Sequence, residues 1–140
     1  MKDIRLMEGV QRRMTKLIPE LRNKTYKERL EHLNLMTLEQ RHIRQDMITM
    51  FNIINNKIDI DIQDIIDIVG GEAKTRGNSL RIRPKNVKLN VRKHTYFCRI
   101  WKTWNLLSED TVRASSLSEF KCKLEKDMKR IFKGQETPYP

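Results

Sequence analysis

Ten of the 33 residues from Ala73 to Asn105 are lysine or arginine, and none of them is aspartate or glutamate. Both basic side chains bind phosphate oxygens, arginine as a two-pronged donor and lysine as a compact charge. The rest of the chain holds 19 basic and 18 acidic residues, so nearly all of the net charge of +11 lies in this segment. Such a concentration of charge attracts polyanions, and nucleic acid is the first candidate. A solvated basic surface that serves only solubility is the alternative.

We therefore predict a surface that binds nucleic-acid phosphates, which positions a nucleic acid without reading its sequence. Most of the contacts are expected in the basic segment, and three basic residues near the N-terminus would widen the surface. The predicted contacts are Arg76, Arg81, Arg83, Lys85, Lys88, Arg92, Lys93, Arg99 and Lys102, together with Arg12, Arg13 and Lys16.

Other chemistries lack the residue patterns that they require. His32, His42 and His94 have no Cys, Ser or Asp at a spacing typical of a catalytic relay or a metal site. Gly70-Gly71 belongs to neither phosphate-loop nor dinucleotide-binding patterns. We predict no catalytic residues, no metal site and no cofactor, so an enzyme is the weakest hypothesis.

The composition indicates one intracellular domain with a heavily charged surface. The chain has 140 residues, of which 38% are hydrophobic and 34% charged. The N-terminus lacks an apolar signal region, and no apolar run approaches the ~18 residues of a membrane span, so neither secretion nor membrane insertion is expected. Cys98 and Cys122 stand alone, which is typical of free, reduced thiols.

The positioning elements of the N-terminal half are predicted to be three helices. The first runs to Pro19, and its apolar residues recur at three- and four-residue steps, which predicts that this face is buried. Capping boxes at Thr25 and Thr37 predict a short helix to about Leu33 and a longer one to about Asn55. The inward face of the first helix is expected to hold Ile4, Met7, Val10, Met14, Leu17 and Ile18.

The middle of the chain changes from acidic to basic. The acidic block from Asp46 to Glu72 reads as a solvated face that balances the basic segment, and Ile62 to Val69 is predicted to be a short helix capped by Asp61. Beyond Gly77, which is expected to occupy a turn of positive φ, residues 79–83 and 87–91 alternate as strands around Pro84. They predict a hairpin with Leu80, Ile82, Val87, Leu89 and Val91 turned inward.

Two helices are predicted in the last third, capped by Thr95 and by Ser116. The first carries four aromatic or aliphatic residues on one face, and these read as core anchors in preference to base-stacking platforms. The predicted fold is mainly α, with about six short helices and a small β-hairpin in a single domain over residues 1–134, followed by a frayed tail over 135–140. Its core is expected to contain Val10, Met14, Leu38, Phe51, Phe97, Trp101, Trp104 and Phe120.

Blocks of residues in a fixed order resemble the tail that follows the polymerase domain in reverse transcriptases of non-LTR retrotransposons, the jockey-like and related clades. The resemblance extends to about Leu124. Ser108 departs from it, because the family usually has proline there, and a looser turn is expected as a result. The start at Met1 departs too, since the family has this region deep inside a polyprotein. The blocks are Lys2–Ile4, Glu8–Arg13, Thr15–Pro19, Tyr26–Leu30 with Leu33 and Leu35, Leu38–Arg41 with Asp46, Thr75–Gly77, Val91–Lys93, Trp104–Leu107 and Phe120-Lys121.

The resemblance implies a part without the polymerase active site, because the chain has no adjacent Asp-Asp pair to bind catalytic metals. It implies a module that handles a template or target, or a domesticated small protein derived from one, and it is the reason to prefer RNA over DNA. The alternative hypothesis is a protein-interaction module, in which an apolar seam between helices joins two copies or binds a partner protein.

Overall fold

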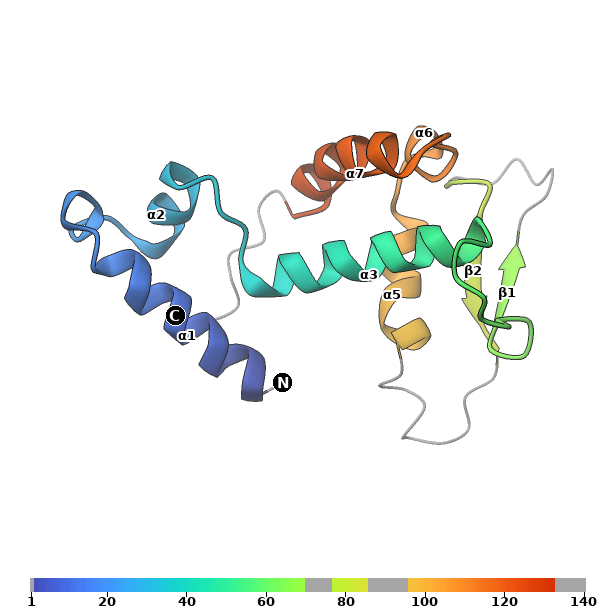
Figure 1. The fold of residues 1–140 in the computed structure, drawn as a ribbon, viewed down its shortest axis with the longest axis horizontal. Coiled ribbons are helices and arrows are strands. Elements are labelled where there is room, and N and C mark those ends of the chain that lie inside the picture. Colours follow the sequence, from blue (N-terminus) through green and yellow to red (C-terminus); the bar gives the residue numbers. More distant parts are fainter. Residues whose placement is uncertain (1, 70–76, 86–95, 133–140) are drawn as a thin grey trace. The chain divides into compact units, whose positions relative to one another are not determined.

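The computed structural model describes residues 2–69, 77–85 and 96–132. These residues form six α-helices, one 3₁₀-helix and two strands, which confirms the predicted mainly α fold with a small antiparallel sheet (Figure 1). The contacts of the chain gather into two compact units, residues 1–43 and 44–140. The elements are α1 (Lys2–Lys16), η1 (Pro19–Leu21), α2 (Tyr26–His32), α3 (Leu38–Ile54), β1 (Ile66–Val69), β2 (Arg81–Pro84), α5 (Tyr96–Asn105), α6 (Glu109–Val112) and α7 (Leu117–Ile131).

In the first unit, α1 packs against α2 through polar side chains. Glu8 accepts hydrogen bonds from the Tyr26 hydroxyl and, at 2.8 Å, from the Leu38 N–H. Burial and the Glu8 carboxylate raise the pKa of Tyr26 to about 12. The buried Arg29 donates from Nε to Thr15 Oγ1 at 3.1 Å. These bonds fix which face of α1 turns inward.

The prediction that the apolar face of α1 is buried is wrong. Met7, Val10, Met14 and Leu17 are 51–73% exposed, so Val10 and Met14 do not belong to the core. The reason is that Glu8, Gln11 and Thr15 find specific partners on and around α2, whereas the few apolar residues of this unit, Leu21 and Leu30 among them, form only a small core.

The predicted caps of this region are confirmed. Thr25 and Glu28 form a reciprocal capping box at the start of α2, and Thr37 and Gln40 exchange the same two bonds before α3. Pro19 lies after the end of α1 and opens the 3₁₀-helix. Asn56 adopts a φ of 53° just beyond the end of α3, where the helix was predicted to stop.

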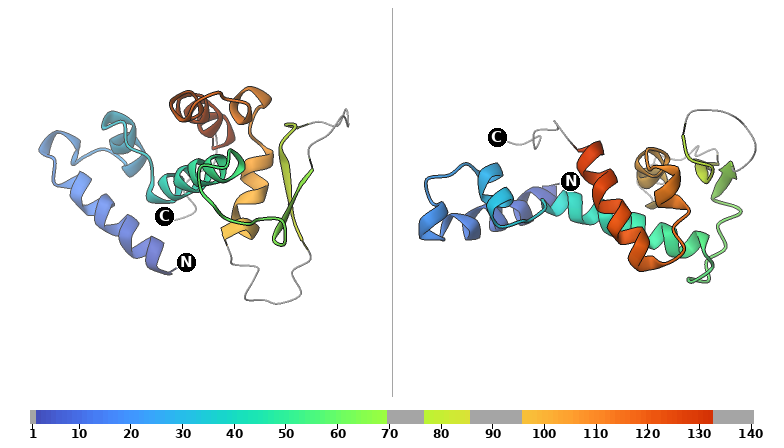
Figure 2. Two further views of the ribbon diagram at one scale, coloured as in Figure 1. Left: turned by 45° about the vertical axis from the view of Figure 1, so that its right-hand side comes forward. Right: turned by 90° about the horizontal axis from the view of Figure 1, so that it is seen from above.

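The core of the second unit is aromatic. The Phe51 ring of α3 stacks on the Phe120 ring of α7 at 4.2 Å between centroids, and Trp104 of α5 stacks on Phe120 at 6.2 Å. Phe97 is buried as well, so these four predicted core residues are confirmed. Trp101 and Leu38 are half-buried. These ring contacts bring α3, α5 and α7 together, and the left view of Figure 2 shows the three helices beside one another.

The helix predicted from Ile62 to Val69 is wrong. Asp61 does begin a turn, in which its Oδ1 accepts from the Gln63 N–H at 3.0 Å. The helical pattern ends after a single turn, however, in which the Ile66 N–H donates to the Ile62 carbonyl. Residues 66–69 then form β1, because three of the four are β-branched and β2 offers a partner strand.

The predicted strand around residue 81 is present as β2, but its described partner is β1. The two strands pair antiparallel with Ile68 opposite Ile82 and Asp67 opposite Arg83. The expected inward face is confirmed for Ile82, which is buried, and Leu80 is half-buried. Pro84, expected in the turn, lies at the end of the strand instead. The predicted strand 87–91, the Thr95 cap and the tail 135–140 lie outside the described residues.

Ser108 does not loosen the chain after α5, contrary to expectation. Its N–H and its hydroxyl both donate to Asp127 Oδ2, at 2.8 and 3.0 Å, which joins the start of α6 to α7. Of the expected capping box at Ser116, half is formed: Ser116 accepts from the Glu119 N–H, while the Glu119 carboxylate binds Ser115.

Candidate nucleic-acid interface

The solvent face of β2 displays three of the predicted basic residues. Arg81 and Arg83 alternate with the buried Ile82, and Lys85 continues the same row just beyond the strand. Side chains two residues apart on a strand share a face and are separated by roughly 7 Å. That spacing is comparable to the separation of successive phosphates in a nucleic-acid strand, so the row can bind adjacent phosphates.

Side chains of α5 hold β2 in this orientation. The Lys85 N–H donates to the Ile65 carbonyl, so by the alternation of an antiparallel ladder the polar backbone groups of Ile82 point away from β1. Asn105 satisfies both: its Oδ1 accepts from the Ile82 N–H at 2.9 Å and its Nδ2 donates to the Ile82 carbonyl at 3.0 Å. Trp104 Nε1 donates to the Leu80 carbonyl at 2.7 Å. The strand is therefore bonded along both edges.

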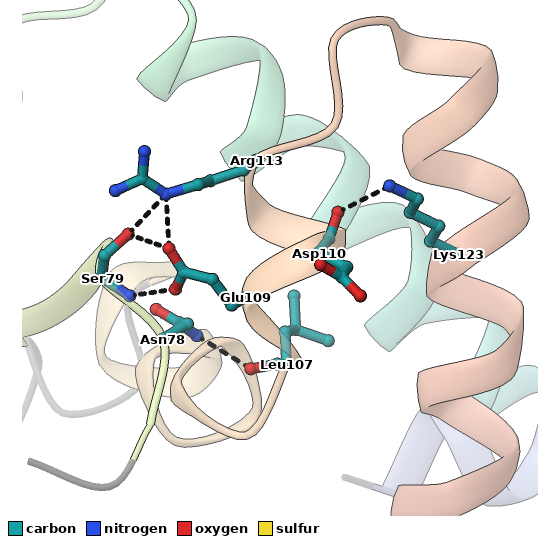
Figure 3. Close-up of polar contacts among 7 residues, drawn as sticks. All are labelled: Asn78, Ser79, Leu107, Glu109, Asp110, Arg113 and Lys123. Carbon is teal, nitrogen blue, oxygen red and sulfur yellow. Dashed lines mark hydrogen bonds and ion pairs between the residues drawn. The ribbon is translucent and has the colours of Figure 1, made fainter.

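The segment that leads into β2 is fixed to the end of α5 and to α6 (Figure 3). The buried Asn78 donates from Nδ2 to the carbonyls of Trp104 and Leu107. The N–H and the hydroxyl of Ser79 each donate to the Glu109 carboxylate at 2.6 Å. Arg113 donates to the same carboxylate, and these bonds, those from Ser79 above all, lower the pKa of Glu109. Gly77, with φ of 129° as predicted, makes the preceding turn.

The basic side chains on this face differ in whether they form an ion pair within the protein. Lys85 Nζ lies 3.4 Å from Asp67 Oδ1 and also donates to the Gln63 carbonyl. Neither Arg81 nor Arg83 forms an ion pair with any residue that the structure describes. Within the row on β2, these two arginines are the residues without an ion pair in the described part of the chain.

The predicted contacts of α5 are partly engaged within the protein. Arg99 makes a bidentate ion pair with Asp46 of α3, with Nη2 at 2.8 Å from Oδ2 and Nε at 3.0 Å from the same atom. The Tyr96 hydroxyl donates to the Asp46 carbonyl beside it. Burial raises the pKa of Tyr96. Lys102 is exposed and lies over the Trp101 ring at 5.7 Å. The acidic block therefore balances the basic segment in part through an ion pair within the protein, between Asp46 and Arg99.

The remaining predicted contacts are either in the first unit or outside the described residues. On α1, Arg13 and Lys16 are exposed, whereas the Arg12 guanidinium lies over the Tyr26 ring at 4.9 Å. The structure brings Arg81, Arg83 and Lys85 together in one row. The four predicted contacts outside the described part of the chain are Arg76, Lys88, Arg92 and Lys93.

Sequence reasoning missed the residues that position this row. Asn105, Asn78 and Glu109 bind backbone or hydroxyl groups far away in sequence, and no local spacing marks such partners. One signal was present for Asp67: the alternation of isoleucine with aspartate over 58–62 and 66–68 is typical of a strand, which would have placed this carboxylate on the face opposite the isoleucines, although not beside the basic row.

Within the described ranges, no group of three or more His, Cys, Asp or Glu side chains is arranged to hold a metal ion. No helix in the same ranges has the length and apolar character needed to span a membrane. Comparisons of the chain with protein-family models, with curated proteins and with solved structures found no match.

Proposed function

We propose that this protein is a nucleic-acid-binding module without catalytic activity, and that it engages phosphates through the basic row on β2. The observation that carries the proposal is that the half-buried Arg81 and the exposed Arg83 share one sheet face, neither with an ion pair among the described residues. Guanidinium groups without a protein partner are suited to bidentate phosphate contacts.

RNA is the preferred ligand, and the ground for it is the resemblance of the chain to the tail of non-LTR retrotransposon reverse transcriptases. The proposal includes an origin in, or a place within, such an element. Phosphate contacts alone do not distinguish RNA from DNA, because that distinction depends on the 2′-hydroxyl and on helix shape.

The test compares binding of single-stranded RNA, duplex RNA and duplex DNA by the unaltered chain and by two charge-matched variants. Arg81→Gln/Arg83→Gln removes two charges from the proposed row, and Lys126→Gln/Lys129→Gln removes two exposed charges from α7. We expect the first variant to lose at least ten-fold in affinity and the second about two-fold, because only the first loses direct contacts. Equal losses would show that net charge alone drives binding, and no binding by the unaltered chain at low salt would refute the proposal.

A second function is supported by a separate observation, the apolar face of α1. Met7, Val10, Met14 and Leu17 follow the 3-4-3 spacing of a coiled-coil seam, and Leu6 extends it. Together they expose an apolar area on the order of 500 Å², which is comparable to the largest patch on a typical monomer, and such patches often serve in binding. We propose that this face pairs with the same face of a second copy, because the seam geometry is that of one helix packing on another helix.

Light scattering coupled to size exclusion tests the pairing. We expect a dimer that persists in high salt and that dissociates in Val10→Glu/Met14→Glu. Leu106→Glu, at an exposed apolar position outside α1, is the control and should remain dimeric. A monomer at all concentrations, or dissociation of both variants, would refute self-association through α1.

A further inference from the structure

One acidic side chain lies within the basic row. On the solvent face of the sheet, Asp67 stands directly opposite Arg83 in the register, and its Oδ1 is 3.4 Å from Lys85 Nζ. Side chains directly opposite in an antiparallel pair have Cβ atoms about 5 Å apart, so Asp67 and Arg83 share one patch of surface. The carboxylate is therefore surrounded by the groups that the proposed function assigns to phosphate binding.

The ion pair between Asp67 and Lys85 can open at a low cost in free energy, so that another anion can take the place of the carboxylate. Both side chains are about half exposed, 53% for Asp67 and 44% for Lys85, and a single contact joins them. Exposed pairs of this kind contribute little to stability and are readily exchanged. The pair between Asp46 and Arg99 differs, because it is bidentate and its carboxylate is only 14% exposed. Of the two pairs that involve predicted contacts, only the one at Asp67 can open at low cost.

A carboxylate and a phosphodiester present the same ligand chemistry to a lysine, namely a single negative charge shared between two acceptor oxygens. We propose that the Asp67 carboxylate occupies the position of one nucleic-acid phosphate on this face, and that binding replaces it with a phosphate held by Lys85 and Arg83. This inference rests on the proposed function.

Two consequences follow for the free and the bound protein. In the free protein Lys85 contributes little to attraction, because its charge is balanced locally. In the complex Asp67 remains close to the bound phosphate and repels it, so the carboxylate holds the affinity below what the row could reach. Asp67 thereby acts against weak, indiscriminate binding of polyanions.

The test uses the full chain and a fluorescently labelled single-stranded RNA, with binding followed by anisotropy at low salt. Asp67→Asn keeps the shape of the side chain and removes its charge. Asp64→Asn, in the exposed turn before β1, makes the same change in net charge and is the matched control. We expect Asp67→Asn to bind three- to ten-fold tighter than the unaltered chain, and Asp64→Asn to gain less than two-fold.

Lys85→Gln, made alone and together with Asp67→Asn, identifies the released partner. Alone it should weaken binding several-fold, because the phosphate loses one of its two proposed ligands, and in the double variant it should remove most of the gain. The slope of log affinity against log salt should become shallower by about 0.7 in Lys85→Gln, which corresponds to the loss of one phosphate contact on a single strand.

The possible outcomes distinguish failure of the inference about Asp67 from failure of the proposed nucleic-acid binding. Equal gains in Asp67→Asn and Asp64→Asn, or a gain that survives Lys85→Gln, would overturn the inference and leave the proposed function intact. An unchanged RNA affinity in Asp67→Asn, with binding still dependent on Arg81 and Arg83, would also overturn the inference and leave the proposed function intact. Absence of RNA binding by both the unaltered chain and Asp67→Asn would refute the proposed function and this inference together.

Discussion

At the scale of single residues, polar side chains with distant partners hold the candidate interface in place. Asn105 supplies one donor and one acceptor to Ile82, and Ser79 is bound through both its N–H and its hydroxyl by Glu109. None of these residues binds the ligand in the proposal. They fix the direction in which Arg81 and Arg83 point.

Asn105→Ala tests how much the strand depends on this support. The change leaves the N–H and the carbonyl of Ile82 without their partners in a partly buried place, so we expect a loss of about 2 kcal/mol in the free energy of unfolding. Urea denaturation measures it. Leu106→Ala, at the exposed neighbouring position, should change the same quantity by less than about 0.5 kcal/mol. Equal effects of the two changes would contradict the assigned role.

The lowered pKa of Glu119, at the start of α7, predicts how the stability of the protein depends on pH. The hydrogen bond from Lys123, together with those from Ser115, lowers the pKa of Glu119 to about 2. A depressed carboxyl pKa contributes stability that is present above the unfolded value and is lost as pH falls through the folded one. We expect unfolding to become easier between about pH 4.5 and pH 2. Glu119→Gln should show a weaker dependence in urea titrations over that range, and an unchanged dependence would contradict the assignment.

At the scale of elements, the sequence predicted those helices well whose caps and buried faces depend on residues close together in the chain. The capping boxes at Thr25 and Thr37 and the aromatic face of α5 were recognised because their partners lie three or four residues away. The inward face of α1 was missed because Glu8 and Thr15 bond to α2, and no periodicity reports such contacts. β1 was missed because a strand depends on a distant partner.

Arg29 and Arg13 provide a matched test of the face that α1 turns inward. Arg29 is buried and bonds to Thr15 and to the Lys24 carbonyl, whereas Arg13 is exposed. We expect Arg29→Ala to lower the free energy of unfolding by about 2–3 kcal/mol and Arg13→Ala by less than about 0.5 kcal/mol. Thermal unfolding followed by circular dichroism measures both. If Arg13→Ala were the more damaging, α1 would have the opposite orientation.

At the scale of the whole molecule, the net charge of +11 is less freely available than the sequence count indicates. Arg99 is neutralised by Asp46, and Lys85 by Asp67, so Arg81 and Arg83 are the members of the row that form no ion pair with any residue in the described ranges. Sequence composition shows where the basic residues are concentrated. It could not show which of these charges form ion pairs within the fold, because such pairs depend on contacts between segments that are far apart in sequence.

The most direct test of the account is the salt dependence of RNA binding. Each phosphate contact on a single strand adds about 0.7 to the slope of log affinity against log salt, so Arg81→Gln/Arg83→Gln should reduce that slope by about 1.4. For the unaltered chain, engagement of about six phosphates of a single strand would lower affinity by roughly 300-fold between 50 and 200 mM salt. A slope that is the same with and without the two arginines would contradict the claim that this strand face binds the phosphates.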